Sequence, residues 1–499
     1  MDYSAIFTAL LPDLIVVVAL FAALGVDYTK LRGASLADRA CAALRICGVG
    51  LVGALVALAF QLTGSFALDG HALEVATHGQ LVLNAGTLAL KALLFLLGLL
   101  VLPLAARTIS TPQVSEYFAL LLLATLGMGF MVTSRNLLGA FVALELVSLS
   151  LYALTALNSA QKGSAKSAEA AEAALKYFTY GGVASAFLLF GISYLFGALG
   201  QLVITQATLA EAPRLVVVAY LFILVGLGFK LALAPFHLWA PDVYQAAPTP
   251  AAAWIASGSK IAGVALLLAL LGPVSLPSAH SAIVPLLLLM AVASMAVGNL
   301  GALRQANVKR LLAYSAIANA GYILVAVVAF TDDGRAAALF YAIVYAVATL
   351  GAFAVVSVWN DRLGREALID DFRGAWKASP GLSLALLVFV LSLAGIPPLA
   401  GFVGKFYLFF AAIHAAPQME YWSDGLYWLV AVALAFSVVA LYYYLKILKA
   451  VFVREETGEM DKTPVGLPTS VAILVLALLT VALGVWPEPV VEYIRLYLF

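Results

Sequence analysis

The chain has 499 residues, of which 64% are hydrophobic and only 11% are charged, and its formal net charge is +1. Soluble domains carry about a quarter charged residues, so this composition excludes an ordinary soluble protein. A bilayer-spanning helix needs about 20 mostly apolar residues, and such runs follow one another along almost the whole chain. The composition therefore predicts an all-α polytopic membrane protein.

Fourteen apolar runs are long enough to be predicted as transmembrane helices. They centre on 6–27, 40–63, 83–106, 116–133, 136–157, 173–198, 213–238, 250–272, 281–303, 309–330, 335–359, 380–413, 424–450 and 467–486. The first run has no basic segment before it and no small-residue cleavage site after it. We therefore expect a retained span at the N-terminus and not a signal peptide.

Lysine and arginine residues are divided unequally between the two alternating sets of loops. If the N-terminus lies outside, the outer loops hold only four of them: Arg135, Arg214, Arg335 and Arg495. Most of the others then fall in cytoplasmic loops, where the positive-inside rule expects them. The charges therefore predict that both termini lie outside, which in a bacterial inner membrane is the periplasmic side, and that the number of spans is even.

Four ionisable residues lie deep inside predicted spans or beside a helix break: Glu145, Lys230, Lys260 and Lys405. A charged residue at mid-span costs about 2.5–3.5 kcal/mol on the translocon scale, so each one is a candidate functional residue. Glu145 is the only carboxylate deep inside a span. An unpaired carboxylate in hydrocarbon must either take up a proton or find a cation, and a buried lysine is its natural partner.

Three other charges admit a structural explanation. Asp13 and Lys91 lie toward the outer ends of their spans, where a charge is less costly. Lys176 follows Glu172 by four residues at the start of a helix. This spacing fits a simple interfacial ion pair, and a role for Lys176 in transport stays open beside it.

Two spans are interrupted next to a lysine. In "GFKLALAPFHLWAP", Pro235 removes a backbone hydrogen bond shortly after Lys230, so the helix should break there. Broken helices at membrane depth line polar cavities, and His237 beyond the proline either satisfies a freed carbonyl or relays protons. The second interruption, "SLAGIPPLAGFVGKFYLFF", places glycines and prolines before Lys405. Because the two spans are five apart, they predict inverted repeats with an ion path between them.

The sequence has no glycine-rich phosphate loop, no cysteine cluster for an iron–sulfur centre and no pair of histidines placed to hold haem. We therefore expect no cofactor in this chain and place any redox chemistry on partner chains.

Four motifs together resemble the antiporter-like proton-pumping subunits of respiratory complex I, a family related to subunits of multisubunit sodium/proton antiporters. The motifs are the span of Glu145, "LALAPFHLWAPDVYQAAPTP", "NVKRLLAYSAIANAGYILVA" and "GIPPLAGFVGKFYLF". The resemblance covers roughly spans 4 to 13. It implies fourteen transmembrane helices with two inverted five-helix repeats, each containing a broken helix.

The resemblance also implies roles for single residues. By motif position, Glu145 resembles the essential glutamate of the fifth helix, Lys230 the lysine of the broken seventh helix, Lys260 the lysine of the eighth helix, and Lys405 the charged residue of the broken twelfth helix. One position departs from the family pattern: this chain has Asn319 where members often have histidine. Water or Lys260 would have to bridge a proton path at that point.

The implied repeats divide the chain into four parts: 1–110 with helices 1–3, 111–275 with the first inverted repeat (helices 4–8), 276–455 with the second inverted repeat (helices 9–13), and 456–499 with helix 14 and a C-terminal tail. The implied partners are a neighbouring antiporter-like subunit, small membrane subunits and lipids, and no nucleic acid. FMN and iron–sulfur clusters are expected on other subunits.

Two transport functions stay open. In the first, the chain is a proton-translocating subunit of NADH-quinone oxidoreductase, driven by redox chemistry in partner subunits. Glu145 and Lys230 then act as a switch: while they are close, Lys230 keeps its proton, and when they separate the proton leaves toward Lys260 and then Lys405. In the second, the chain is a sodium/proton antiporter subunit with no redox partner. A purely structural membrane anchor is disfavoured, because it gains nothing from about 10 kcal/mol of unfavourable burial.

Overall fold

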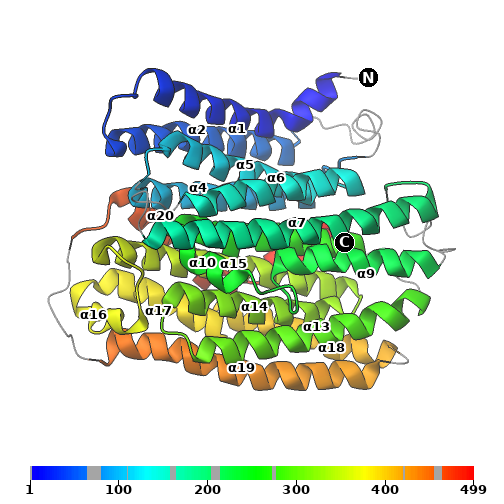
Figure 1. Ribbon diagram of the computed structural model, residues 1–499. Helices are drawn as coiled ribbons and strands as arrows, with labels where there is room; N and C mark the ends of the chain where they lie inside the picture. The colour runs from blue at the N-terminus through cyan, green and yellow to red at the C-terminus, as the bar shows by residue number, and fades with distance from the viewer. Residues whose placement is uncertain are drawn as a thin grey trace.

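A computed structural model of the protein is a bundle of long helices that lie side by side (Figure 1). It describes residues 3–64, 80–109, 111–157, 165–203, 214–271, 277–419, 422–454 and 463–498. Apart from isolated bridges, these residues form helices and no strands, and 12 helical segments among them are long and apolar enough to cross a membrane. The predicted all-α membrane class is confirmed.

The first half of the chain contains α1 (Tyr3–Thr29), α2 (Leu36–Leu62), α4 (Ala85–Thr108), α5 (Val114–Thr133), α6 (Leu137–Ala156), α7 (Ala165–Leu199), α9 (Arg214–Leu231), α10 (Ala240–Ala246), α11 (Thr249–Ala256) and α12 (Gly258–Leu271). The second half contains α13 (Pro277–Leu303), α14 (Val308–Val327), α15 (Asp332–Leu363), α16 (Ala375–Ala378), α17 (Pro380–Ala394), α18 (Ala400–Ala415), α19 (Ser423–Phe452), α20 (Leu467–Val485) and α21 (Glu488–Leu498). Every predicted run coincides with one of these helices or with two consecutive ones.

The predicted count of fourteen spans stays a prediction. Runs 213–238 and 380–413 contain α9 and the pair α17 and α18, which are shorter than the other spanning helices. Each of these runs is interrupted where prolines were expected to break it. Helix α9 ends at Leu231, and α17 ends at Ala394 before Gly395. Gly395 has φ +83°, and a Cβ there would lie 3.1 Å from the Cδ of Lys405, so a glycine is needed at this break.

Helix α15 lies at the centre of the bundle. Its most apolar stretch is entirely buried, and it packs against α11 and α12 of the first half and against α14, α17 and α18 of the second. The two halves therefore meet around one helix, and the contacts between them can position side chains from both.

One end of the bundle carries ion pairs between neighbouring helices, and we call it the basic end. Arg39 of α2 pairs with Asp27 of α1 at 2.6 Å, and Arg107 of α4 pairs with Asp361 of α15 at 2.8 Å. The basic residues that define this end are Arg39, Arg107, Lys309, Arg310 and Arg362. The end is thus held together by charges from both halves of the chain.

The C-terminal helix α21 lies at the opposite end. The Tyr493 hydroxyl donates to the carbonyl of Ala85, the first residue of α4, at 2.9 Å, and Arg495 pairs with Asp333 at the start of α15 at 2.6 Å. Sequence analysis expected a tail here and missed the helix, because its apolar residues occupy a single face and are too few for a span. Helix α1 also begins at this end, so both ends of the described chain lie on the same side.

Asp13 and Lys91 form a buried ion pair between α1 and α4, with 2.5 Å between Oδ2 and Nζ. Lys91 is only 1% exposed, and its Nζ lies 5.3 Å from the centre of the Phe130 ring. The pair explains how two charges are tolerated within these spans: each neutralises the other. It lies in the N-terminal helices, apart from the other candidate residues.

Candidate functional site

Three of the candidate residues are buried lysines. Lys230 is the penultimate residue of α9, Lys260 lies in the first turn of α12, and Lys405 lies in α18. Their exposed fractions are 2%, 2% and 6%. A lysine in hydrocarbon is expensive unless its ammonium group finds polar partners, so the atoms around each Nζ indicate what the site can do.

Two of these lysines hold the carboxyl end of a broken helix. Lys260 Nζ donates to the carbonyl of Leu231, the last residue of α9. Lys405 Nζ donates to the carbonyl of Ala394, the last residue of α17, at 3.4 Å. The last carbonyls of a helix lack intrahelical partners and carry its partial negative charge, so a cation is favourable there. By these contacts Lys260, and not Lys230, is the counterpart of Lys405.

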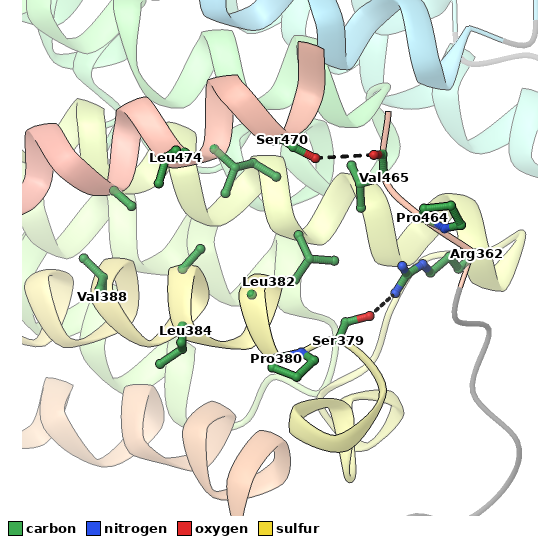
Figure 2. Close-up of a pocket in the computed structure, with 14 residues that line it drawn as sticks. Arg362, Ser379, Pro380, Leu382, Leu384, Val388, Pro464, Val465, Ser470 and Leu474 are labelled. Carbon is green, nitrogen blue, oxygen red and sulfur yellow. Dashed lines mark hydrogen bonds between the residues drawn. The ribbon is translucent and has the colours of Figure 1, made fainter. Parts of the chain in front are cut away.

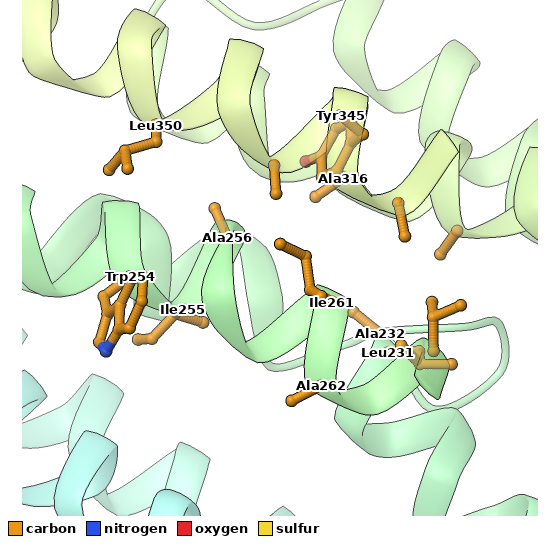
Figure 3. Packing of buried hydrophobic residues seen from close by; sticks show 14 of the residues in the cluster. Leu231, Ala232, Trp254, Ile255, Ala256, Ile261, Ala262, Ala316, Tyr345 and Leu350 are labelled. Carbon is orange, nitrogen blue, oxygen red and sulfur yellow. The ribbon is translucent and has the colours of Figure 1, made fainter. Parts of the chain in front are cut away.

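The surroundings of Lys260 are tightly packed and apolar. Figure 3 shows buried side chains of this part of the core, among them Leu231 of α9, Ile261 of α12 and Tyr345 of α15, and Leu231 and Tyr345 line a cavity together with Lys260. A cavity of about 10 Å³ remains beside Lys260, and α14 and Tyr345 contribute to its wall. This is close to the smallest space that holds a water molecule.

Glu145 lies on α6, half-buried, and accepts a hydrogen bond from the Ser185 hydroxyl of α7. Lys230 Nζ donates to the Ser148 hydroxyl, also on α6, at 3.3 Å. Residues three apart share a face of a helix, so Ser148 is a neighbour of Glu145. The direct ion pair between Glu145 and Lys230 that the sequence led us to expect is not present in this conformation. Glu145 contacts Ser185 of α7, and Lys230 contacts Ser148 of α6, so each charge has a serine partner near the same part of α6.

Lys176 lies at the basic end and not in the buried interior. Its side chain is 40% exposed, and its Nζ lies 2.7 Å from Glu172 and 2.9 Å from Asp242. Asp242 also accepts a hydrogen bond from Arg310 of α14 at 2.8 Å. Burial alone would raise the pKa of the Asp242 carboxyl, but the hydrogen bonds from Lys176 and Arg310 outweigh it and hold the pKa below its ordinary value. The ion pair with Glu172 is present, as its spacing suggested.

His237 lies in the connection between α9 and α10 and is half-buried. No hydrogen bond or ion pair joins it to the other candidates, all of which lie within the described residues. The structure therefore brings together Glu145, Lys230 and Lys260. It places Lys176 at the basic end and Lys405 at the break between α17 and α18, and it gives His237 no contact with the other candidates.

Sequence analysis missed a polar network in the second half of the chain, centred on Asn319 of α14. Tyr341 of α15 donates to Asn319 Oδ1 at 2.5 Å, and Asn319 Nδ2 donates to the carbonyl of Ser315 at 2.8 Å. The hydroxyls of Ser315 and Tyr444 are 2.5 Å apart. The members of this network lie on α14, α15 and α19, which are all largely apolar helices. The sequence signal for the network was therefore no more than single polar residues within apolar runs.

Lys405 lies close to another tyrosine, Tyr322 of α14. Its Nζ lies 4.9 Å from the centre of the Tyr322 ring, and the Tyr322 hydroxyl accepts a hydrogen bond from Asn299. The small cavity beside Lys260 is bounded by Ala320, the residue next to Asn319. Lys260 and Lys405 thus both lie beside α14: Lys260 borders the cavity that Ala320 also lines, and Lys405 lies over the Tyr322 ring.

The family described as "NADH:quinone oxidoreductase/Mrp antiporter, TM" matches residues 134–423, more than half of the chain. All six candidate residues named from the sequence fall inside this range. The chain belongs to this family. The family expected from the four motifs is thereby confirmed.

Relatives in the NADH:quinone oxidoreductase/Mrp antiporter family extend the match to the full length. "NADH-quinone oxidoreductase subunit N 2" of Acidobacterium capsulatum is 42% identical and covers 99% of each chain. A chain in the structure of respiratory complex I from Thermus thermophilus is 34% identical, with a TM-score of 0.75 and coverage of 96% of this chain and 98% of that one. A chain of an archaeal membrane-bound sulfane sulfur reductase is 28% identical with a TM-score of 0.79, and 97% of each chain is covered.

Proposed function

We propose that this chain is the proton-translocating membrane subunit of a bacterial NADH:quinone oxidoreductase, corresponding to subunit N. The observation that carries the proposal is the line of buried lysines, two of which hold the ends of broken helices, in a chain whose full-length relative bears that name. Its partners are a neighbouring antiporter-like subunit and small membrane subunits of the complex. Other subunits hold FMN and the iron–sulfur clusters.

The buried groups support a route for the proton. While Glu145 lies close to Lys230, its negative charge favours the protonated lysine. A movement of α6 that separates them favours release of the proton. The nearest buried acceptor along the chain is Lys260, which contacts the carbonyl of Leu231 beside Lys230. Lys405 then receives the proton and passes it to the outer side.

The step from Lys260 to Lys405 passes the position where this chain has Asn319. An amide does not take up and release protons as a histidine does, so Asn319 cannot carry the proton itself. A water molecule in the cavity beside Lys260 would carry it across. Tyr345, which lines that cavity together with Lys260, would then orient the water.

The alternative is a sodium/proton antiporter subunit, which belongs to the same family by its description. In transporters with broken helices, the carboxyl ends of half-helices commonly coordinate the transported cation. Here both of these ends are occupied by a lysine ammonium group. This arrangement favours proton transfer through the lysines over binding of sodium.

Replacing Lys260 with methionine tests the proposed function. In vesicles containing the purified complex, proton uptake driven by NADH should fall about tenfold or more, a barrier increase of at least about 1.4 kcal/mol, because the acceptor between Lys230 and Lys405 is lost. Uptake by the wild-type complex should be the same with and without sodium. Proton uptake that depends on a sodium gradient and does not change when NADH is added would favour the antiporter instead.

We propose that the basic end faces the cytoplasm, following the positive-inside rule, so that both termini are periplasmic. Cysteines placed at positions 2 and 499, which lie outside the described residues, test this in a variant without Cys41 and Cys47. A membrane-impermeant thiol reagent should label both from the periplasmic side of intact cells. Labelling only after the cytoplasmic side is opened would reverse the orientation.

We also propose that residues 111–275 and 276–455 are the inverted repeats, preceded by 1–110 and followed by 456–499. The two interrupted helices support this division, since one lies in each proposed repeat and each ends beside a lysine contact.

A further inference from the structure

A groove of about 590 Å³ runs between α17 and α20 at the basic end of the bundle. Figure 2 shows its two walls: Leu382, Leu384 and Val388 project from α17, and Leu474 projects from α20. From Gly381 to Val388, the groove follows α17 for about 10 Å at 1.5 Å per residue. Its walls are almost entirely apolar and run along the helices, so the groove has the shape and chemistry to hold a hydrocarbon chain.

The mouth of this groove is polar and positively charged. Arg362, at the end of α15, donates to the Ser379 hydroxyl at 2.8 Å and to the carbonyl of Thr463 at 2.6 Å. These two contacts fix the guanidinium group between the segments that lead into α17 and α20 (Figure 2). The amino end of α17, at Pro380, opens at the same place. A guanidinium group and a helix amino end both favour an anion.

A second basic residue lies near the mouth. Lys377 is exposed two residues before Ser379, and Trp376 beside it is 39% exposed. Tryptophan side chains gather at the level of lipid headgroups, which places the mouth at the surface of the bilayer. An apolar slot inside the bilayer thus opens at a cationic site at its surface.

We propose that this groove binds an acidic phospholipid, with one acyl chain between α17 and α20 and the phosphate against Arg362. Basic pockets between transmembrane helices on the cytoplasmic side are suited to acidic headgroups. The acyl chain is already in hydrocarbon when it enters the groove, so the preference for an acidic lipid comes from the charge at the mouth. The proposal does not depend on the transport function. It rests on the proposed orientation only in naming the cytoplasmic leaflet. A bound lipid would also restrict the movement of α17, whose last carbonyl accepts the hydrogen bond from Lys405.

A phosphatidylglycerol with a photoreactive diazirine on its acyl chain tests the site in the purified complex. After illumination, label should be found on peptides of α17 and α20 that line the groove. Unlabelled phosphatidylglycerol should compete and phosphatidylcholine should not. Ala385→Phe fills the groove from α17 and should lower this labelling about tenfold. Ala477→Phe fills it from α20 and serves if the first variant does not assemble.

Two further variants separate the headgroup from the acyl chain. Arg362→Gln should keep the labelling but make both lipids compete equally, since the acyl slot remains and the cation is gone. Leu434→Phe, on the exposed surface of α19, is the matched control and should change nothing. Equal competition by the two lipids in the wild-type complex would show a non-specific lipid surface and overturn the proposal. The absence of lipid label on the groove residues of the wild-type complex would also overturn the proposal.

Discussion

Replacing Glu145 with glutamine, Lys230 with methionine, or both should reduce NADH-driven proton uptake to nearly the same low level. Glu145→Gln removes the charge that holds a proton on the buried lysine, and Lys230→Met removes the site that carries it. Because either change disables one step, the double variant should be hardly worse than either single variant. Non-additivity of this kind is expected of groups that act together. The measurement is proton uptake by the assembled complex in vesicles, with the NADH oxidation rate recorded beside it.

The structure adds two controls to this experiment. Ser148→Ala removes the hydroxyl that accepts the hydrogen bond from Lys230 and leaves both charges, so its effect on uptake should be smaller. Lys176→Met removes an exposed lysine at the basic end, and its effect should add independently to that of Glu145→Gln. Losses that multiply in the Glu145 and Lys230 double variant would mean two separate sites, and the switch would have to be abandoned.

The spans and their interruptions could be predicted because they depend on local chemistry. A run of apolar residues marks a helix in a bilayer, and Pro235 or Gly395 interrupts it for reasons that lie in its own backbone. The central place of α15 could not be predicted. Its apolar residues face other helices, whereas those of α1 or α19 largely face outward, but in a membrane both environments are apolar. Periodicity therefore says little about which helix is central.

The contacts of the buried charges were the harder part to predict. The sequence showed that Glu145, Lys230 and Lys260 were costly to bury. It could not show that Lys260 reaches Leu231 or that Lys230 meets Ser148, because those contacts depend on how α6, α9 and α12 approach one another. Opposite charges suggested a pair, yet at membrane depth hydroxyls and helix ends are equally available partners.

Replacing Lys405 with methionine should abolish most proton uptake while the complex still assembles and oxidises NADH. Lys405 is packed against Gly395, and its Nζ lies over the Tyr322 ring. Alanine would leave a cavity, which costs stability, so methionine is the better test of charge because it nearly conserves volume. The carbonyl of Ala394 would lose a donor at a cost of about 1–3 kcal/mol, partly offset because no charge is then buried.

Lys309 supplies the matched control for this prediction. It is as buried as Lys405, at 1% exposed, and it also donates to a backbone carbonyl, that of Ala247 next to α10. However, it pairs with Glu366 at the basic end and lies outside the proposed route. Lys309→Met should therefore lower the melting temperature of the complex and retain proton uptake per NADH oxidised. Lys405→Met should lower the melting temperature less and lose most of the proton uptake per NADH oxidised. If both variants lose stability and keep uptake, Lys405 only caps α17, and the proton must leave the protein without it.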